Sequence, residues 1–424
     1  MVVVKECFWC KSKNIKFFTK RIDDKPVSEC LDCGLLLVTN LPDDLSEFYQ
    51  DEAYFNPAGE TSTGYHENYN YISPLYLYWQ GSLLNEVARL SGAKTLLEVG
   101  CATGNALEMI KARSPQIKTT GIDLSPYAIE QCRAKGIESD VSTINEYANN
   151  KRKYDIVFSS ETMEHVDDLY EFVESADKLI NKSGVFVFYV PGVVKADMAQ
   201  QKNQYVSLTT SLEHVSYFTS DFLNKAMKQI FGNVSLIQMS TDGEDYIMGV
   251  ASNNRALVDD MAKFINGLKK FDSKLSDPDS IFNLTIIASK FALFDLADKY
   301  LDLLKRDFEN SKMTCLAGAL VAFNKGELEN AKLLFSDYLA KTQTTDELIY
   351  KLMHANEREL ALIYKSQMLE FAQQVEAQRN LKERLDRVEN ELLDLKHSKI
   401  VGSSILARKA IGKTLDPIRR QKKN

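Results

Sequence analysis

The sequence contains no run of about 18 consecutive apolar residues, so no segment of it is predicted to span a membrane as a helix. The first residues, MVVVKECFWC, lack the long apolar stretch and the small-residue cleavage site of a secretory signal. An excess of basic residues is also missing, because the formal net charge is −7, and this argues against bulk binding of nucleic acid by the whole chain. At 424 residues the chain is long enough for about three domains. We therefore expect a multidomain globular protein of the cytoplasm.

Without a secretory signal, a disulfide framework is a poor explanation for the seven cysteines, and metal binding is a better one. Four of them form two C-x2-C pairs, whose members are Cys7, Cys10, Cys30 and Cys33. Four thiolates suit tetrahedral Zn(II), with iron in a rubredoxin-like site or four unrelated reduced thiols as the alternatives. No histidine or carboxylate joins the set, so residues 1–40 are predicted to form a zinc ribbon with a structural or docking role.

Residues 41–90 are predicted to link the ribbon to the next domain, and they are unusually rich in tyrosine. Pro57, Gly59 and Gly64 interrupt any long regular element there. Such a segment is typical of a lid that closes over a substrate and excludes water, or of aromatic padding between two domains. Both interpretations stay open, and His66 is an isolated histidine within it.

Residues 91–255 alternate between short apolar strands and helices. Strands are predicted at Thr95–Val99, Lys118–Asp123, Tyr154–Ser159 and Gly184–Val190, with a helix at Ala106–Ala112 after the first of them. This alternation predicts an α/β fold with a doubly wound, mostly parallel sheet and helices on both faces. Ligands of such sheets bind beyond the carboxyl ends of the strands, where the strand order reverses.

The turn after the first strand lacks the G-x-G-x-x-G pattern of dinucleotide sites. It has instead the series acid-x-Gly-x-small-x-Gly, carried by Glu98, Gly100, Ala102 and Gly104. With this series the chain resembles the class I S-adenosylmethionine-dependent methyltransferases over roughly residues 90–250. The resemblance implies a Rossmann-like core and S-adenosylmethionine as the cofactor.

The resemblance also implies roles for the residues of the first turn. Gly100 and Gly104 let the backbone approach the methionine part of the cofactor. Glu98 orients the loop or holds the cofactor's ammonium group. Ala102 stands where glycine is commoner, and we expect it to tighten the turn without forbidding it.

Further cofactor contacts are implied after the next strands. Asp123 is expected to accept hydrogen bonds from both ribose hydroxyls, with Leu124 beside it. Asp140 and Val141 resemble the adenine clamp, although Asp140 also fits a surface turn. Ser160 begins a loop, SETMEHV, that resembles the segment closing under the cofactor in small-molecule methyltransferases.

Two histidines of the core are candidates for proton transfer. The segment Glu213-His214-Val215-Ser216-Tyr217-Phe218-Thr219 resembles an element of sugar and polyketide-type methyltransferases. We predict that His214 is the general base, that Glu213 orients it, and that His165 is a second catalytic candidate. A histidine packed in a loop is the structural alternative for both.

The same resemblance suggests a sugar or glycan acceptor that is methylated on oxygen or carbon. Another small metabolite is the alternative acceptor, and a non-catalytic scaffold that binds the cofactor is the alternative from a different class. Nucleic acid is not expected, because no Asp/Asn-Pro-Pro-aromatic loop follows Tyr154–Ser159 and no basic stripe accompanies the domain.

The last third of the chain is predicted to be helical. Residues 256–345 contain two weak copies of a 34-residue period, with Ala288 matching Ala322 and Ala297 matching Ala331, which resembles tetratricopeptide repeats. A generic helical bundle is the alternative.

Residues 346–398 carry no glycine or proline and place apolar residues at heptad spacing. They predict a coiled coil that makes the protein a homo-oligomer, with a helix packed on its own domain as the alternative. Residues 399–424 combine eight Lys/Arg with apolar residues near one helical face. They predict a basic amphipathic tail that contacts the inner face of a membrane, while a disordered tail and a partner-binding helix fit as well.

Overall fold

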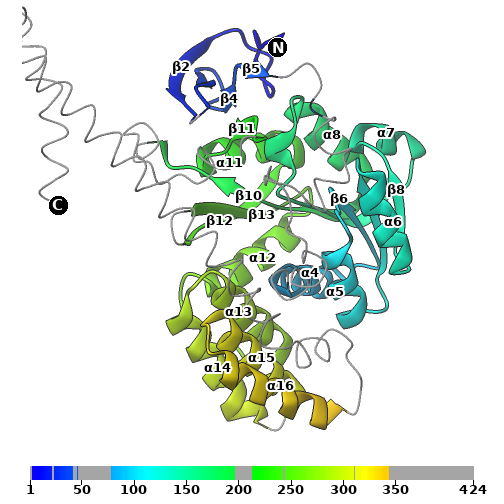
Figure 1. Ribbon diagram of the computed structural model, residues 1–424, viewed down its shortest axis with the longest axis vertical. Helices are drawn as coiled ribbons and strands as arrows, with labels where there is room; N and C mark the ends of the chain where they lie inside the picture. The colour runs from blue at the N-terminus through cyan, green and yellow to red at the C-terminus, as the bar shows by residue number, and fades with distance from the viewer. Residues whose placement is uncertain are drawn as a thin grey trace, which may run out of the picture. The chain divides into compact units, whose positions relative to one another are not determined.

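The computed structural model describes residues 2–21, 23–41, 45, 78–195, 213–241, 244–309 and 311–342 (Figure 1). Most of the predicted lid, the predicted coiled coil at residues 346–398 and the predicted tail at residues 399–424 lie outside the described residues. Within the described ranges, no helix has the length and apolar character that crossing a membrane requires.

The centre of the fold is a seven-stranded sheet with the order β12-β13-β10-β9-β6-β7-β8. Neighbouring strands from β10 to β8 run parallel, whereas β13 is antiparallel to both β10 and β12. The strands are β6 (Thr95–Val99), β7 (Lys118–Asp123), β8 (Glu138–Val141), β9 (Tyr154–Ser160), β10 (Ile180–Gly192), β12 (Asn233–Thr241) and β13 (Glu244–Ser252). The predicted α/β class is confirmed, and β6 and β7 have the predicted bounds.

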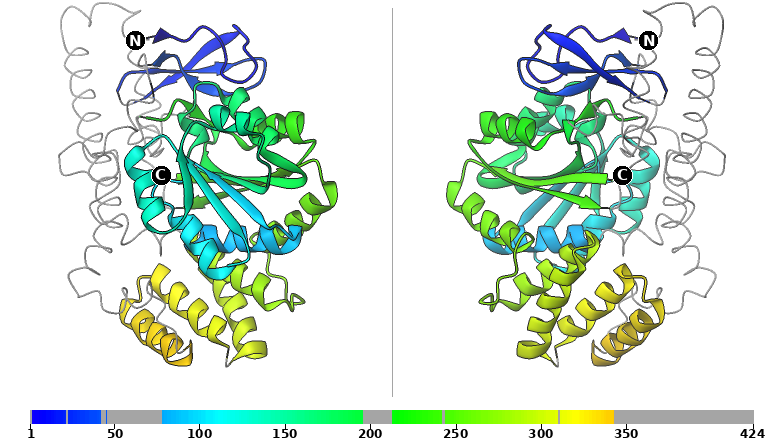
Figure 2. Two further views of the ribbon diagram at one scale, coloured as in Figure 1. Left: turned by 90° about the vertical axis from the view of Figure 1, so that its right-hand side faces the viewer. Right: turned by 90° about the vertical axis from the view of Figure 1, so that its left-hand side faces the viewer.

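Helices cover both faces of this sheet, as Figure 2 shows. Successive strand residues alternate between two apolar cores, so that Leu96 and Val187 pack in one while Leu97 and Phe188 pack in the other. The first core holds α4 (Tyr78–Ser91), α5 (Asn105–Arg113), α6 (Pro126–Ala134) and α12 (Arg255–Gly267). The second holds α7 (Ile144–Tyr147), α8 (Leu169–Leu179) and α11 (Ser220–Phe231). Short 3-10 turns, η1 (Ala148–Asn150) and η2 (Met163–His165), complete this part.

The strand order reverses at β6, which pairs with β7 on one side and with β9 on the other. The chain leaves β6 for α5 and β7, and returns to the opposite side of β6 only with β9. The loops after β6 and β9 therefore flank the reversal point, the position at which open α/β sheets bind ligands.

The N-terminal ribbon shares a sheet with the core. Its own strands are β1 (Val2–Val3), β2 (Ile15–Lys20), β3 (Pro26–Cys30), β4 (Leu36–Val38) and β5 (Asn40–Leu41). The four-stranded sheet has the order β11-β4-β3-β2, and its edge strand β11 (Ser216–Tyr217) comes from far along the chain. Trp9 also packs edge-on against Tyr170 and Phe222 of the core. The ribbon is thus built into the wall of the larger domain.

Two helical hairpins follow α12, and Figure 1 shows them as α13 to α16. Their bounds are α13 (Pro278–Lys290), α14 (Phe294–Phe308), α15 (Lys312–Asn324) and α16 (Leu328–Thr342). Every bound of the second hairpin lies 34 residues after its counterpart in the first. The alanines at this spacing are all buried, which explains why a small residue recurs where one helix approaches the next.

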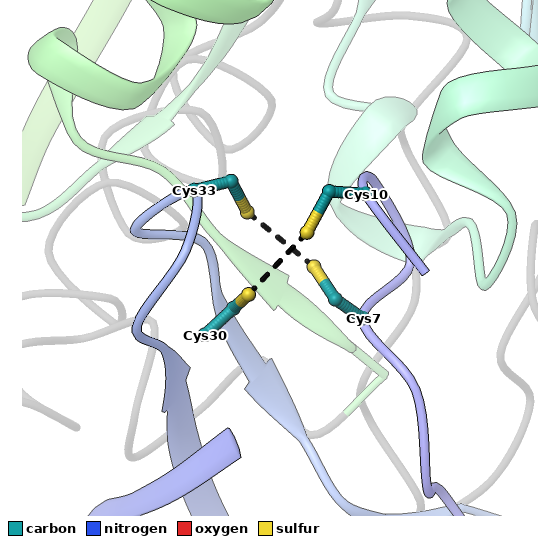
Figure 3. A group of neighbouring side chains, drawn as sticks. All are labelled: Cys7, Cys10, Cys30 and Cys33. Carbon is teal, nitrogen blue, oxygen red and sulfur yellow. Dashed lines mark hydrogen bonds between the residues drawn. The ribbon is translucent and has the colours of Figure 1, made fainter. Parts of the chain in front are cut away.

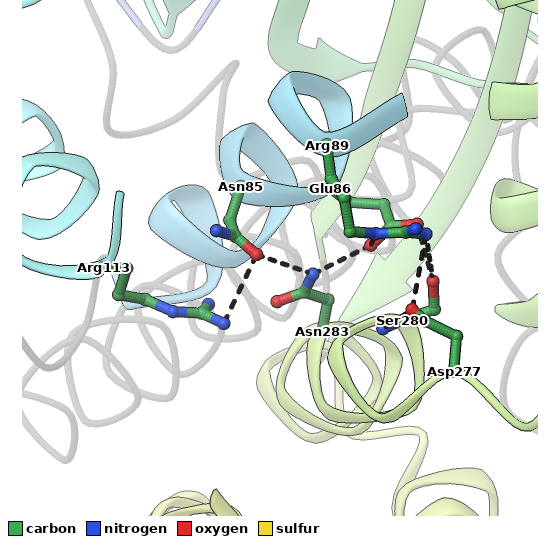
Figure 4. A network of polar contacts seen from close by, with 7 residues as sticks. All are labelled: Asn85, Glu86, Arg89, Arg113, Asp277, Ser280 and Asn283. Carbon is green, nitrogen blue, oxygen red and sulfur yellow. Dashed lines mark hydrogen bonds and ion pairs between the residues drawn. The ribbon is translucent and has the colours of Figure 1, made fainter. Parts of the chain in front are cut away.

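A polar network joins the first hairpin to the core, as drawn in Figure 4. The carboxylate of Glu86 on α4 is 1% exposed and accepts hydrogen bonds from Arg89 at 2.6 Å, Ser280 at 2.7 Å and Asn283 at 2.9 Å. Arg89 also lies 3.4 Å from Asp277, the N-cap of α13. A buried carboxylate is tolerated here because nearly every donor around it points at it.

Replacing Glu86 by alanine removes the acceptor that these donors share. We expect Glu86→Ala to lower the free energy of unfolding by about 2 kcal/mol, less than for a fully buried ion pair because Arg89 is partly exposed. Scanning calorimetry should show a melting temperature several degrees lower. Glu130→Ala, on the exposed side of α6, is the control and should leave it unchanged; equal melting of both variants would contradict the structural role of Glu86.

Candidate active site

The loop after β6 has a backbone that only small residues permit. Gly100 has φ +73°, and a Cβ atom there would lie 2.3 Å from the hydroxyl of Thr162 in the loop after β9. Gly104 has φ +78°, and a Cβ there would lie 2.8 Å from Cys132 Sγ. Ala102 adopts φ +46°, so the expected departure from glycine is accommodated in a left-handed conformation. The loops after β6 and β9 therefore pack directly on each other at the reversal point.

Asp123 fixes this loop from the end of β7. Its Oδ2 accepts a hydrogen bond from the backbone N–H of Ala102 at 2.9 Å, and its Oδ1 accepts one from Ser125 at 2.9 Å. Burial raises the pKa of Asp123. The backbone N–H groups that face the carboxylate, including that of Leu124, lower this pKa and offset part of the effect of burial. Each oxygen keeps a further lone pair, so the position suits the predicted contact with vicinal hydroxyls.

Glu98 lies at the end of β6 with its side chain buried. Its Oε2 has no hydrogen-bond partner among the described residues, and burial raises the pKa of the carboxyl well above its ordinary value. A buried acceptor such as this oxygen normally has a cationic or N–H partner. The ammonium group of the predicted cofactor would be such a partner. The residues around the loop therefore fit S-adenosylmethionine.

Asp140 and Val141 stand at the end of β8, on the same edge of the sheet. Both are exposed, Val141 by 48%, and Asp140 lies 3.8 Å from Arg133. Val141 could pack on an adenine ring and Asp140 could accept a hydrogen bond from its amino group, as predicted. In this structure, however, Asp140 is already paired with Arg133.

Ser160 ends β9 and is tied to a residue that the sequence did not single out. Its hydroxyl accepts a hydrogen bond from Gln80 Nε2 at 2.8 Å, and Gln80 is buried near the start of α4. The sequence placed this region in a linker, and no motif marks a lone glutamine on a helix. Gln80 thus connects the end of the predicted linker to the last residue of β9.

Glu164, His165 and His214, with Glu213 beside them, form what we call the acid–histidine cluster. Glu164 Oε1 lies 3.9 Å from Nε2 of both His165 and His214, and the two rings meet edge-on with centroids 4.8 Å apart. The two 3.9 Å separations exceed hydrogen-bond distance, so Glu164 lies beside both imidazoles without bonding to either. The structure brings together the two histidines chosen from the sequence, and it adds Glu164, which the sequence analysis did not select.

Burial dominates the electrostatics of the acid–histidine cluster. It raises the pKa of Glu164 well above its ordinary value, and the nearby Glu161 and Glu213 raise it further. Burial lowers the pKa of His165 to about 4 and that of His214 well below 6.5. Both carboxyl oxygens of Glu164 and Nδ1 of His214 lack partners among the described residues. The cluster therefore keeps neutral imidazoles and unsatisfied polar atoms beside the loop after β9.

The four ribbon cysteines converge on one point, as Figure 3 shows. Sγ atoms of Cys7 and Cys33 are 3.4 Å apart, those of Cys10 and Cys30 are 3.5 Å apart, and all four lie within 4.8 Å of one another. Tetrahedral zinc with Zn–S bonds of about 2.3 Å needs S···S separations of about 3.8 Å. The set fits zinc, which these residues would hold as a closed site.

The knuckle backbones support the same arrangement. The N–H of Trp9 donates to Cys7 Sγ at 3.4 Å, while Gly34 turns the second knuckle with φ +87°. Interaction with Cys33 lowers the pKa of the Cys7 thiol to about 5, whereas burial raises that of Cys10 to about 11. At least one thiol is thus already disposed to bind as a thiolate.

A doubly wound sheet with an acid–glycine loop after its first parallel strand and an acid after the next is the core of a class I methyltransferase. The family model described as "Methyltransferase domain" matches residues 75–230 of this chain. The resemblance found in the sequence is confirmed.

Curated relatives are similar to a part of the chain. Ubiquinone biosynthesis O-methyltransferase of Nitrosomonas europaea is 33% identical over 125 residues, which is 28% of this chain and 50% of the relative. Malonyl-[acyl-carrier protein] O-methyltransferase of Acetivibrio thermocellus is 33% identical over 96 residues, 22% of this chain and 34% of the relative. The chain thus spans half or less of the length of these relatives.

Among solved structures, the plantazolicin methyltransferase BpumL in complex with SAH aligns with a TM-score of 0.37 and 12% identity. The alignment covers 49% of this chain and 93% of that one.

The zinc assignment predicts that loss of one thiolate empties the ribbon. Cys30→Ser should abolish the single bound zinc ion seen by native mass spectrometry and inductively coupled plasma analysis, because three thiolates do not close a tetrahedral site. Cys315→Ser, in α15, is the matched control and should retain the metal. Iron in the wild-type protein, or no metal at all, would contradict the assignment.

The packing of Gly100 predicts a specific loss of cofactor affinity. Gly100→Ala places a methyl group on the hydroxyl of Thr162 and should weaken binding of S-adenosylhomocysteine by at least about tenfold in calorimetric titration. Gly92→Ala has a similar φ of +68° but open space around its Cβ, so it carries the backbone strain alone. Equal affinity of the two variants would show that the contact between the loops is not needed.

Proposed function

We propose that the protein transfers the methyl group of S-adenosylmethionine to a sugar or glycan acceptor, on oxygen or carbon, with His214 accepting the proton that the acceptor loses. One observation carries the proposal: the buried acid–histidine cluster directly follows the loop that packs on Gly100. Residues of the cofactor loop and groups suited to proton transfer thereby meet at the reversal point of the sheet.

The cofactor would supply an electrophilic methyl group on a sulfonium, so the chain need only bind, align and deprotonate the acceptor. The loop from Gly100 to Gly104, held by Asp123, would bind the cofactor, and Glu98 would meet its ammonium group. Zinc would stabilise the ribbon through its four cysteines.

His214 is suited to accept a proton because burial keeps its imidazole neutral. Its Nε2 faces Glu164, while Nδ1 lacks a partner among the described residues and is the atom to which we assign the incoming proton. Glu164, whose Oε1 lies 3.9 Å from Nε2, would be the acid beside the resulting imidazolium. His165 would hold the other side of Glu164, where its ring lies against that of His214.

A second acceptor class is a small metabolite with an ionisable oxygen, and the names of the two curated relatives favour it. One is an O-methyltransferase of ubiquinone biosynthesis and the other acts on malonyl-[acyl-carrier protein]. Neither name mentions a sugar, so the choice between the two classes belongs to experiment. Homo-oligomerisation through residues 346–398 and lipid contact through residues 399–424 are further proposals that rest on the sequence pattern alone.

The test is turnover with defined acceptors. Purified protein with isotopically labelled S-adenosylmethionine, nucleotide sugars, glycan precursors and small hydroxylated or carboxylated metabolites should give a methylated product by mass spectrometry. A sugar product supports the first class and a non-sugar product the second. Binding of the cofactor without S-adenosylhomocysteine formation in any reaction would favour a non-catalytic scaffold.

His214→Ala should lower kcat by about 10²–10⁴, because a positioned general base contributes that much. Affinity for S-adenosylhomocysteine should stay close to that of the wild type, since no cofactor-loop residue changes. Glu130→Ala, at an exposed position of α6, is the control. Full activity of His214→Ala would remove this residue from the mechanism.

A further inference from the structure

Arg21 is a ribbon residue whose side chain is almost fully buried against the core. It follows β2, and its guanidinium is 1% exposed. Nε and Nη2 donate to the two carboxylate oxygens of Asp23, at 3.0 and 2.5 Å. Nη1 donates to the backbone carbonyl oxygen of His214 at 2.9 Å, across 193 positions of sequence.

The segment that begins at His214 is held from two sides. On the core side, the N–H of Val215 donates to the carbonyl oxygen of Glu164 at 2.8 Å. On the ribbon side, Val38 donates to the carbonyl oxygen of Val215 at 2.9 Å, and Ser216 pairs with Leu37 in the sheet. His214 thus lies two residues before β11, the strand that completes the ribbon's four-stranded sheet.

We propose that Arg21 is a positioning residue for His214, so that the ribbon contributes a residue to the support of the proposed catalytic site. The inference rests on the proposed function, because it explains how the assigned base is held. A carbonyl that accepts from a buried guanidinium has a fixed orientation, and the Cα–Cβ direction of the same residue follows from it. The bidentate pair with Asp23 fixes the guanidinium in turn.

Burial of the Arg21–Asp23 ion pair costs desolvation free energy, and a fixed geometry is the benefit that we assign to it. A buried arginine must be paired, and removing it takes the guanidinium donor from the His214 carbonyl, while Asp23 keeps its contacts with the N–H of Lys25 at 3.3 Å and with Lys25 Nζ at 3.9 Å. Displacement of a catalytic group by about 1 Å costs on the order of 10² in rate. Loss of Arg21 should therefore affect kcat through the position of the imidazole.

Arg21 also acts on His214 through its charge. The groups that face this imidazole are Glu164 and His165 from η2, its neighbour Glu213, and Arg21 from the ribbon. Burial is the main cause that lowers the pKa of His214, with His165 and the Arg21 cation adding to it. Removing the cation makes the imidazolium less unfavourable, so the pKa of His214 should rise.

The first experiment observes the imidazole directly and needs no acceptor. The chain has five histidines, so [¹³Cε1]histidine labelling gives few signals, and that of His214 is identified by its loss in His214→Ala. Spectra of the zinc-loaded full chain with S-adenosylhomocysteine are compared for Arg21→Met, Arg21→Lys and the control Lys20→Met. Lys20 is an exposed neighbour on β2 that pairs with Asp24 at 3.8 Å, so its variant changes the ribbon charge alone.

In Arg21→Met the His214 signal should leave its wild-type position and should titrate at a higher pH, while Lys20→Met should match the wild type. Arg21→Lys keeps the charge without the fork and should give an intermediate displacement. Zinc content should be unchanged in all variants. An unshifted His214 signal in zinc-loaded Arg21→Met overturns the inference. Should that variant not fold, Asp23→Ala releases the guanidinium but keeps its charge, so it should displace the His214 signal without raising the pH at which it titrates, and an unshifted signal there overturns the inference.

The second experiment uses the acceptor found in the turnover screen. Arg21→Met should lower kcat on the order of 10² with little change in cofactor affinity. Combined with His214→Ala it should cause no additional loss, because a residue that acts through another is silent once that residue is gone. Multiplied losses overturn the inference. Full activity of His214→Ala refutes the proposed base instead, and the spectra still decide whether Arg21 positions it.

Discussion

The contact between Gly100 and Thr162 is the constraint on which the rest of the site depends. The loops after β6 and β9 come from opposite sides of the point where the strand order reverses, and they meet without room for a side chain on the first loop. The cofactor residues from Glu98 to Asp123 lie on one side of this contact, whereas Ser160, at the end of β9, lies on the other. The acid–histidine cluster lies on the same side as Ser160. Close packing of the Gly100 backbone on the Thr162 side chain is therefore what places the loop after β6 next to the acid–histidine cluster.

The cluster also shows how environment assigns chemistry to ordinary side chains. Neither a glutamate nor two histidines are unusual in composition, yet enclosure removes the water that would otherwise stabilise their charged forms. The result is a set of groups whose pKa values are shifted toward one another, with the carboxyl raised and both imidazoles lowered. Such shifted groups are typical of functional sites, because proton transfer needs groups whose charged and neutral forms are close in free energy.

Features with local signals could be predicted from the sequence. The bounds of β6 and β7 follow from strand signals that stop before Gly100 and at Asp123. The 34-residue spacing of buried alanines likewise marked two hairpins whose bounds repeat with the same offset. Periodicity of this kind is encoded within a few turns of chain, so it survives without knowledge of the fold.

Contacts between distant segments could not be derived in this way. The two-residue strand β11 has no periodicity of its own, and only its pairing with β4 reveals that the ribbon extends to the catalytic segment. Arg21 and Gln80 belong to no motif. Glu164 was considered only as part of the segment SETMEHV, which resembles a loop of other methyltransferases. The role of each residue depends on a partner that the fold brings from elsewhere in the chain. Composition and spacing do not reveal such partners.

The borrowed edge strand has a consequence for how the protein is made. The ribbon leaves the ribosome before β11, so its sheet stays one strand short until residues 216 and 217 have been synthesised. During that interval β4 presents unpaired backbone groups, which favour pairing with other nascent chains. All four ribbon cysteines are therefore synthesised before the sheet around them is complete, and an isolated ribbon fragment keeps the same exposed edge permanently.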